Sequence, residues 1–205
     1  MTEAGGMRPV VQQRGHLTTT RVLDATLDIL GERGAQGVTI AAVSQRSGVA
    51  NGSIYHRFGD RRQLLVAAHG RFLSRLSESS ESDSAEWFSA EDRHQFLTGF
   101  VDMFLTAISD NRTLIFAFVS LGRDDPDMWT AGMTWSRSLA QRFTHILVER
   151  FGCSLEASDT AFRMVYSYAL LPAMFGDDEI STGATSSADR ARHLVTAVEA
   201  VADQY

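Results

Sequence analysis

The stretch Ser47–Leu65, SGVANGSIYHRFGDRRQLL, decides the fold of the N-terminal part of this chain. It holds three glycines, an adjacent tyrosine and histidine, and three arginines. Gly48 can adopt the left-handed turn conformation without a Cβ penalty, so two short helices can meet there at a tight turn. Thr39 is a suitable N-cap for the helix that ends at Gly48, and a further short helix is expected from about Ala50 to Phe58. Together they predict a helix-turn-helix.

The residues on either side of this pair extend the helical pattern. Upstream, leucines recur at helical spacing between Thr18 and Gly34, which predicts a first helix over 18–34. Downstream, Asp60 can cap a fourth helix that begins at Arg61. We therefore expect a flexible arm over residues 1–17, a helix-turn-helix domain over 18–63, and a larger helical domain over 64–205.

The charges are divided unevenly between the two parts of the chain. Residues 1–75 carry ten arginines against five acidic residues, a net +5, whereas residues 76–205 carry a net −11 within an overall charge of −6. The chain has no lysine, so all of its basic side chains are guanidinium groups. This asymmetry favours a basic module for an anionic partner, although a solvated charged face would give the same pattern.

The side chains of Ser47–Leu65 suit the groove of a polyanion. Short or polar groups can reach phosphates and base edges: Ser47, Asn51, Ser53, Tyr55 and His56. Arginines add charge for the phosphate backbone, where most of the affinity arises: Arg57, Arg61 and Arg62. Because Ala50 and Gly52 are small, the helix could lie deep in a major groove.

The run from Thr39, TIAAVSQRSGVANGSIYHRFGDRRQLL, resembles the DNA-binding segment of the TetR family of bacterial transcriptional regulators. Residues that match the family pattern are Gly48, Val49, Gly52, Ser53, Ile54, Tyr55, Phe58 and Leu64. The resemblance implies phosphate contacts from Tyr55 and Arg57, and a backbone anchor at Thr39. It also implies base-facing positions, which are Ala50, Asn51 and Ser53. Arg61 stands where the family usually has lysine, and Ala50 where a capping serine is common.

The second half of the chain is expected to be helical throughout. The acidic, serine-rich segment Ser77–Glu86 suggests a frayed helix end and a surface loop. The apolar run Thr113–Leu121 is interpreted as a buried helix, and Asp125-Pro126 as a helix start. A helix over Asp159–Phe175, kinked at Pro172, and a final helix around Leu194 complete an all-α fold.

Regulators of the family are typically homodimers whose larger domain binds a small molecule and releases a palindromic operator, so the resemblance implies these partners here. Methionine and aromatic side chains make adaptable apolar pockets, and the candidate ligand-binding residues are Phe100, Phe104, Phe116, Met128, Trp129, Met133, Met164 and Tyr168. The same residues would also suit a plain core. His145 is a candidate polar anchor, although the sequence favours a surface histidine or a satisfied core histidine at this position.

The last two helices are the candidates for self-association. A helix that is apolar on two faces must be covered on both, and a second copy of the chain is a natural cover, the alternative being the protein's own core. The expected interface residues are Phe162, Val165, Tyr166, Ala169, Leu194, Val195, Val198 and Val201.

The sequence gives little support for other classes of function. It has no Gly-x-Ser-x-Gly, phosphate-binding loop or Rossmann fingerprint, so we expect no enzyme activity and no cofactor. The histidines and Cys153 do not cluster, so no metal site is expected. No apolar run approaches a membrane span or a secretory signal, which favours a cytoplasmic protein. A regulator whose helical domain docks a protein, or has no effector, remains the alternative to a ligand-responsive repressor.

Overall fold

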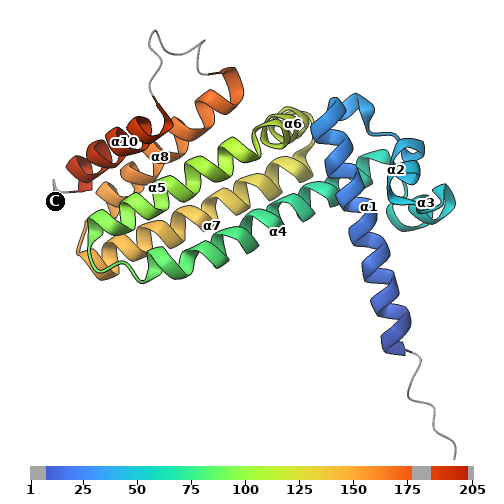
Figure 1. Cartoon of the computed structure of the whole chain (residues 1–205), viewed down its shortest axis with the longest axis horizontal. Helices are drawn as coiled ribbons and strands as arrows, with labels where there is room; N and C mark the ends of the chain where they lie inside the picture. The colour runs from blue at the N-terminus through green and yellow to red at the C-terminus, as the bar shows by residue number, and fades with distance from the viewer. Residues whose placement is uncertain (1–7, 177–185, 203–205) are drawn as a thin grey trace, which may run out of the picture.

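The computed structural model describes residues 8–176 and 186–202, and for residues 8–14 and 79–88 the backbone only. Over these residues the protein is all-α, as predicted, and the described part contains no strand. The helices are α1 Arg8–Gly37, α2 Ile40–Ser47, α3 Asn51–Phe58, α4 Arg61–Phe88, α5 Arg93–Asp110, α6 Arg112–Gly122, α7 Pro126–Phe151, α8 Leu155–Phe175 and α10 Ser187–Ala202. Figure 1 shows α1–α3 gathered at one end of a longer helical bundle, with α4 running from one part into the other.

The first helix begins earlier than the sequence pattern indicated. Residues 8–17, expected to belong to a flexible arm, are helical in α1, and the rest of that arm, residues 1–7, lies outside the described residues. Pro9 in the first turn explains the early start, because its fixed φ suits a helix and its missing N–H is not needed there. At the other end, the helical geometry breaks where predicted, at Gly34, which has φ 66° and ψ −175°.

The helix-turn-helix forms with the expected local signals. The Thr39 side chain accepts a hydrogen bond from the Ala42 amide at 3.1 Å and caps α2, and Gly48 ends α2 with a left-handed φ of 68°. Ala50 occupies the N-cap of α3 without any side-chain hydrogen bond. Asp60 caps α4 through a hydrogen bond from the Gln63 amide to its Oδ1 atom at 2.8 Å.

The serine-rich segment is part of a helix and not a loop. The backbone of α4 remains helical through residues 77–86 and ends at Phe88. Serine and aspartate have only modest helix penalties, of about half a kilocalorie per mole each, glutamate is a good helix former, and no glycine or proline interrupts the run. Polarity was therefore a poor guide to the helix end.

Helices α4–α8 and α10 form the bundle, and an aromatic cluster lies at its centre. The ring of Phe100 lies 4.5 Å from that of Phe143 and 5.9 Å from that of Phe104, centroid to centroid, and Phe143 lies 5.7 Å from Phe162. Asp125 caps α7 at the predicted Asp-Pro start, accepting hydrogen bonds from the amides of the first turn. Helix α8 continues past Pro172 to Phe175.

No single described helix is both long and apolar enough to cross a membrane. Helices α5 and α6 meet that requirement only as a pair, by length and composition, and the two are bent by 76° at their junction.

Candidate DNA-binding surface and apolar pocket

Helix α3 presents most of its residues to solvent at one end of the molecule (Figure 1). Of the DNA-binding residues predicted from the sequence, Thr39 and Ala50 are exposed at the starts of α2 and α3. The other predicted residues of α3 are also exposed: Asn51, Gly52, Ser53, Tyr55, His56 and Arg57. The structure thus leaves the predicted groups exposed at the end of the molecule that α1–α3 form.

Buried contacts hold this surface in position. Ile54 faces inward from α3 and is almost completely buried, and Val49 is buried in the turn. The Arg21 guanidinium of α1 donates a hydrogen bond to the Ser47 carbonyl at 2.6 Å, which ties the end of α2 to α1. The exposed face of α3 is therefore presented by a small packed core.

Two of the predicted phosphate-binding arginines hold the domain together. Arg57 donates to the carbonyl of Gly15 at 2.6 Å and also contacts the Thr19 hydroxyl, both in α1. Arg61 donates through Nε to the Val38 carbonyl at 2.7 Å and also bonds the Ala35 carbonyl. Both side chains remain exposed. The structure gives them a role within the protein, beside the phosphate contacts that the sequence implied.

Arg62 connects the helix-turn-helix end of the molecule to the bundle. Its guanidinium lies 2.7 Å from Asp125 Oδ2 and 2.7 Å from Asp127 Oδ2, so the first turn of α4 is paired with the start of α7. Partial burial opposes ionisation of Asp125, but hydrogen bonds from the Met128 amide and from Arg62 lower its pKa below the ordinary value. Arg62 is therefore committed to this pair, not to a free basic face.

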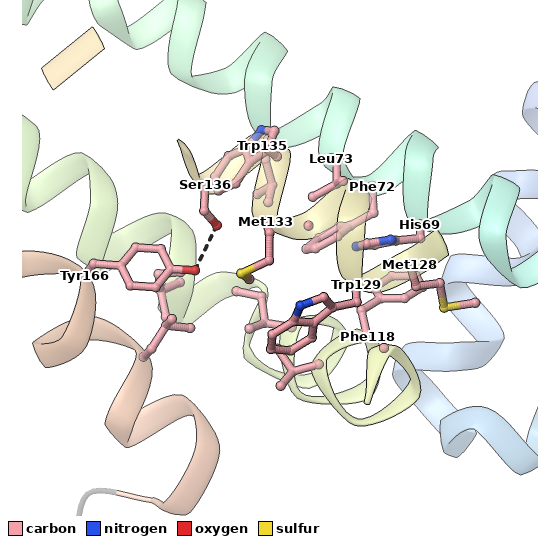
Figure 2. A pocket seen from close by; sticks show the side chains of 17 residues that line it. His69, Phe72, Leu73, Phe118, Met128, Trp129, Met133, Trp135, Ser136 and Tyr166 are labelled. Atoms are coloured by element: carbon pink, nitrogen blue, oxygen red, sulfur yellow. Dashed lines mark hydrogen bonds between the residues drawn. The ribbon is translucent and has the colours of Figure 1, made fainter. Parts of the chain in front are cut away.

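A mainly apolar pocket opens between α4, α6, α7 and α8, with Ile108 of α5 also in its wall (Figure 2). The centre of a water-sized sphere can occupy about 90 Å³ of this pocket. Its lining residues are His69, Phe72, Leu73, Leu76, Ile108, Ile115, Phe118, Val119, Gly122, Met128, Trp129, Gly132, Met133, Trp135, Ser136, Tyr166 and Leu170.

Only three of the eight predicted ligand-binding residues line this pocket, namely Met128, Trp129 and Met133. Phe100 and Phe104 are buried in the aromatic cluster, where neighbouring rings fill the space. The other three lie outside the lining: Phe116 and Tyr168 are exposed, and Met164 packs against the core. Helical spacing indicated that these apolar side chains share helix faces, but it did not indicate which face of each helix borders a cavity.

Sequence reasoning missed His69, Trp135, Ser136 and Tyr166. His69 is buried, whereas His145, the histidine considered from the sequence, is exposed. A signal for His69 existed, because it lies four residues after Leu65 and three before Phe72 and so belongs to the apolar face of α4. Among the described residues, no group of three or more histidine, cysteine or acidic side chains could hold a metal ion.

The predicted dimer interface lies mostly inside the protein. Six of the eight residues are buried within the chain, namely Phe162, Val165, Ala169, Leu194, Val195 and Val198, and the remaining two, Tyr166 and Val201, are half-buried. The other face of α8 is open instead. Tyr168, Leu171 and Phe175 are 39%, 47% and 61% exposed and follow one another at helical spacing. The six buried residues pack within the protein's own core, which was the alternative that the sequence allowed, so they are not available to a partner in this arrangement.

The fold and these sites define a protein whose helix-turn-helix domain is joined to a helical bundle containing an apolar pocket. Residues 22–68 match the model of the bacterial regulatory proteins of the tetR family. The match covers α2, α3 and the adjoining parts of α1 and α4.

Individual relatives at 30% identity or more are similar over part of the chain. The chain is 34% identical over 79 residues to the HTH-type transcriptional repressor KstR of Mycobacterium tuberculosis, a match that covers 38% of this chain and 36% of KstR. It is 38% identical over 74 residues to the HTH-type transcriptional regulator BetI of Serratia proteamaculans, covering 36% of this chain and 34% of BetI. The chain thus spans about a third of the length of these curated relatives.

The fold extends further than the sequence similarity. A regulator from Saccharomonospora viridis, crystallised in complex with choline, matches with a TM-score of 0.71 at 14% identity and covers 90% of this chain and 96% of its own. At that identity the likeness concerns the fold alone.

Proposed function

We propose that this protein is a sequence-specific DNA-binding transcriptional regulator, and that it acts as a repressor which a small, mainly apolar molecule releases from its operator. The single observation that carries the proposal is the exposed face of α3, with Asn51, Ser53 and Tyr55 held outward by the buried Ile54. Such a helix can enter a major groove, where polar side chains read base edges. A regulator of this kind would work in the cytoplasm.

The apolar pocket supports a small-molecule effector. It adjoins α4 and the first turns of α7, through His69 and Met128, and the same two helices carry the ion pair between Arg62 and Asp125. A molecule that displaces Met128 would move the start of α7 and, through Arg62, the first turn of α4. For this to change DNA binding, the molecule must bind one of the two arrangements more tightly than the other.

The exposed apolar stripe of α8 supports a homodimer. Tyr168, Leu171 and Phe175 are exposed in the single chain at helical spacing, and a second copy could cover them symmetrically. Two recognition helices related by a two-fold axis would bind a palindrome with half-sites one helical turn apart, about 34–36 Å. A small relative movement of the two copies would then be enough to lose the operator.

The proposal is tested by selecting duplexes from a random DNA pool with the purified protein and sequencing what it retains. We expect a palindrome with half-sites about one helical turn apart. Asn51→Ala and Ser53→Ala should change the base preference, whereas Gln141→Ala, an exposed substitution on α7, should leave it unchanged. Retention of DNA without a shared sequence, or no retention at low salt, would contradict operator recognition.

A further inference from the structure

The pocket contains one buried polar side chain whose hydrogen-bonding capacity the described part of the protein does not use. His69 is 5% exposed, and its imidazole has no hydrogen-bond partner among the described residues. Its ring lies against Phe118, with centroids 4.6 Å apart, and its Cε1 edge faces Gly132 of α7. A buried polar group without a partner is costly, so a ligand that satisfied it would gain affinity and selectivity together.

The other polar groups of the pocket are already paired. The hydroxyl groups of Ser136 and Tyr166 lie 2.9 Å apart in a mutual hydrogen bond, and Trp135 donates from Nε1 to the Ser77 hydroxyl at 2.9 Å. Figure 2 shows the Ser136–Tyr166 pair on the opposite side of the view from His69, with Met133 and Trp129 between them. Among the buried and half-buried lining side chains that carry a nitrogen or oxygen atom, His69 is thus the one without a hydrogen bond to another described residue.

The lining carries no acidic or basic residue other than this histidine. A carboxylate or a primary ammonium ion would lose its hydration there without an opposite charge in the lining itself, which disfavours its binding. A quaternary ammonium could gain cation–π contacts with Trp129 and Phe118, but it has no N–H to offer the imidazole. Charge and hydrogen bonding thus both favour a neutral ligand.

We propose that the pocket binds an uncharged, mainly apolar molecule. The single hydroxyl, carbonyl or amide group of this ligand hydrogen-bonds to the His69 imidazole, and His69 determines this specificity. The proposal rests on the proposed role of the bundle as an effector-binding domain. It adds the chemical class of the effector and the residue that selects it.

The protonation state of His69 agrees with this assignment. Burial lowers the pKa of His69, and the nearby Asp125 carboxylate opposes that shift without cancelling it. At neutral pH the imidazole is therefore uncharged, with one ring nitrogen donating and the other accepting. Either a ligand hydroxyl or a ligand carbonyl can form the bond.

Four single-ring probes of similar size separate the possible ligand classes: benzyl alcohol, toluene, benzyltrimethylammonium and benzoate. The pocket volume of about 90 Å³ suits such molecules in scale. Binding is followed on the isotopically labelled full chain through the indole N–H signals of Trp129 and Trp135, which both line the pocket. We expect benzyl alcohol to bind about tenfold more tightly than toluene, and both ions to bind more weakly than benzyl alcohol.

Two substitutions test the role of His69. His69→Leu removes the hydrogen-bonding group at similar size, so we expect toluene binding to persist and the roughly tenfold preference for benzyl alcohol to disappear. His69→Gln retains donor and acceptor groups and should recover part of that preference. This recovery separates a hydrogen-bonding role from a purely packing role.

Gly132→Ala provides a variant that leaves the fold intact. A Cβ atom there would lie 3.6 Å from Cε1 and 3.9 Å from Nε2 of His69, which is ordinary contact, and alanine is preferred over glycine within a helix. The added methyl group occupies the space beside the imidazole. We expect weaker binding of benzyl alcohol without loss of thermal stability.

Several results would overturn the proposal: no binding of benzyl alcohol by the natural protein, tighter binding of benzyltrimethylammonium, or a preference that survives His69→Leu. All of these measurements use the protein without DNA. If the duplex selection fails but the four probes bind in the expected order, the proposed regulator is overturned and the pocket chemistry is supported. If the duplex selection succeeds but the probes do not bind in that order, only the proposed ligand class is overturned.

Discussion

A single methyl group on α3 should separate the stability of this protein from its affinity for DNA. Gly52 lies in the first turn of α3, has no positive φ, and a Cβ atom built on it meets nothing within 4 Å. Gly52→Ala should therefore raise the free energy of unfolding by up to about 1 kcal/mol, through a smaller loss of backbone entropy. For a chain of this length, that corresponds to a Tm about 1–4 °C higher.

The same methyl group should weaken DNA binding. If the backbone of α3 approaches the groove at Gly52, the added group has to displace the helix or the DNA, at a cost of about 1–3 kcal/mol by analogy with overpacked interiors. The dissociation constant should then rise by about 5- to 150-fold. Thermal unfolding followed by circular dichroism measures the first effect, and fluorescence anisotropy on the selected duplex measures the second.

Gly48→Ala is the matched comparison, since the same change is made in the turn before α3. Gly48 has a left-handed φ of 68°, and its Cβ atom would lie 3.1 Å from the Arg21 guanidinium that binds the Ser47 carbonyl. This substitution should lower the free energy of unfolding by about 1–2 kcal/mol and the Tm by about 2–8 °C. If Gly52→Ala bound the duplex like the natural protein, our placement of α3 against the groove would be wrong. If it unfolded at a lower temperature, our reading of the open space at Gly52 would be wrong.

Other predictions concern the surfaces of the bundle. Leu171→Asp should convert a dimer into a folded monomer, as measured by sedimentation with circular dichroism as the control, and a natural chain that is already monomeric would refute the α8 interface. Arg62→Gln removes the pairing with Asp125 and Asp127, so it should lower Tm at low salt and reduce the salt sensitivity of Tm. An unchanged Tm at low salt would refute the ion-pair connection between α4 and α7. Because the pKa of His69 is lowered on folding, the unfolded chain binds a proton near pH 6.5 that the folded chain does not. Stability should therefore fall as the pH drops below about 6.5, and His69→Leu should make denaturation curves at pH 5.5 and 7.5 more alike.

The local features of the fold could be predicted because they depend on neighbours in the chain. A helix cap joins a side chain to an amide two or three residues later, so it depends little on distant parts of the chain. Thr39 caps α2 in this way through the Ala42 amide, and Asp60 and Asp125 cap α4 and α7. The early start of α1 and the long α4 were missed for a related reason. Residues 8–17 lie outside the regular leucine spacing of the first helix, and residues 77–86 are polar, so neither pattern gave a reliable helix boundary.

The pocket and the interface could not be predicted in the same way. Trp129 and Phe104 are both large apolar residues at helical spacing, yet one borders a cavity and the other is stacked on Phe100. Which of the two occurs depends on how several helices cross, and that is not encoded in the period of any one of them.

The sequence by itself determined the all-α class, the helix-turn-helix and the exposed polar face of α3, since turns, caps and amphipathic spacing act over a few residues. Only the tertiary structure decided that Phe162 faces inward while Phe175 faces outward, and that His69 of α4 meets Gly132 of α7 beside an apolar cavity. A helix with two apolar faces has two possible ways to pack, and the choice between them is made by the neighbouring helices that compete to cover it.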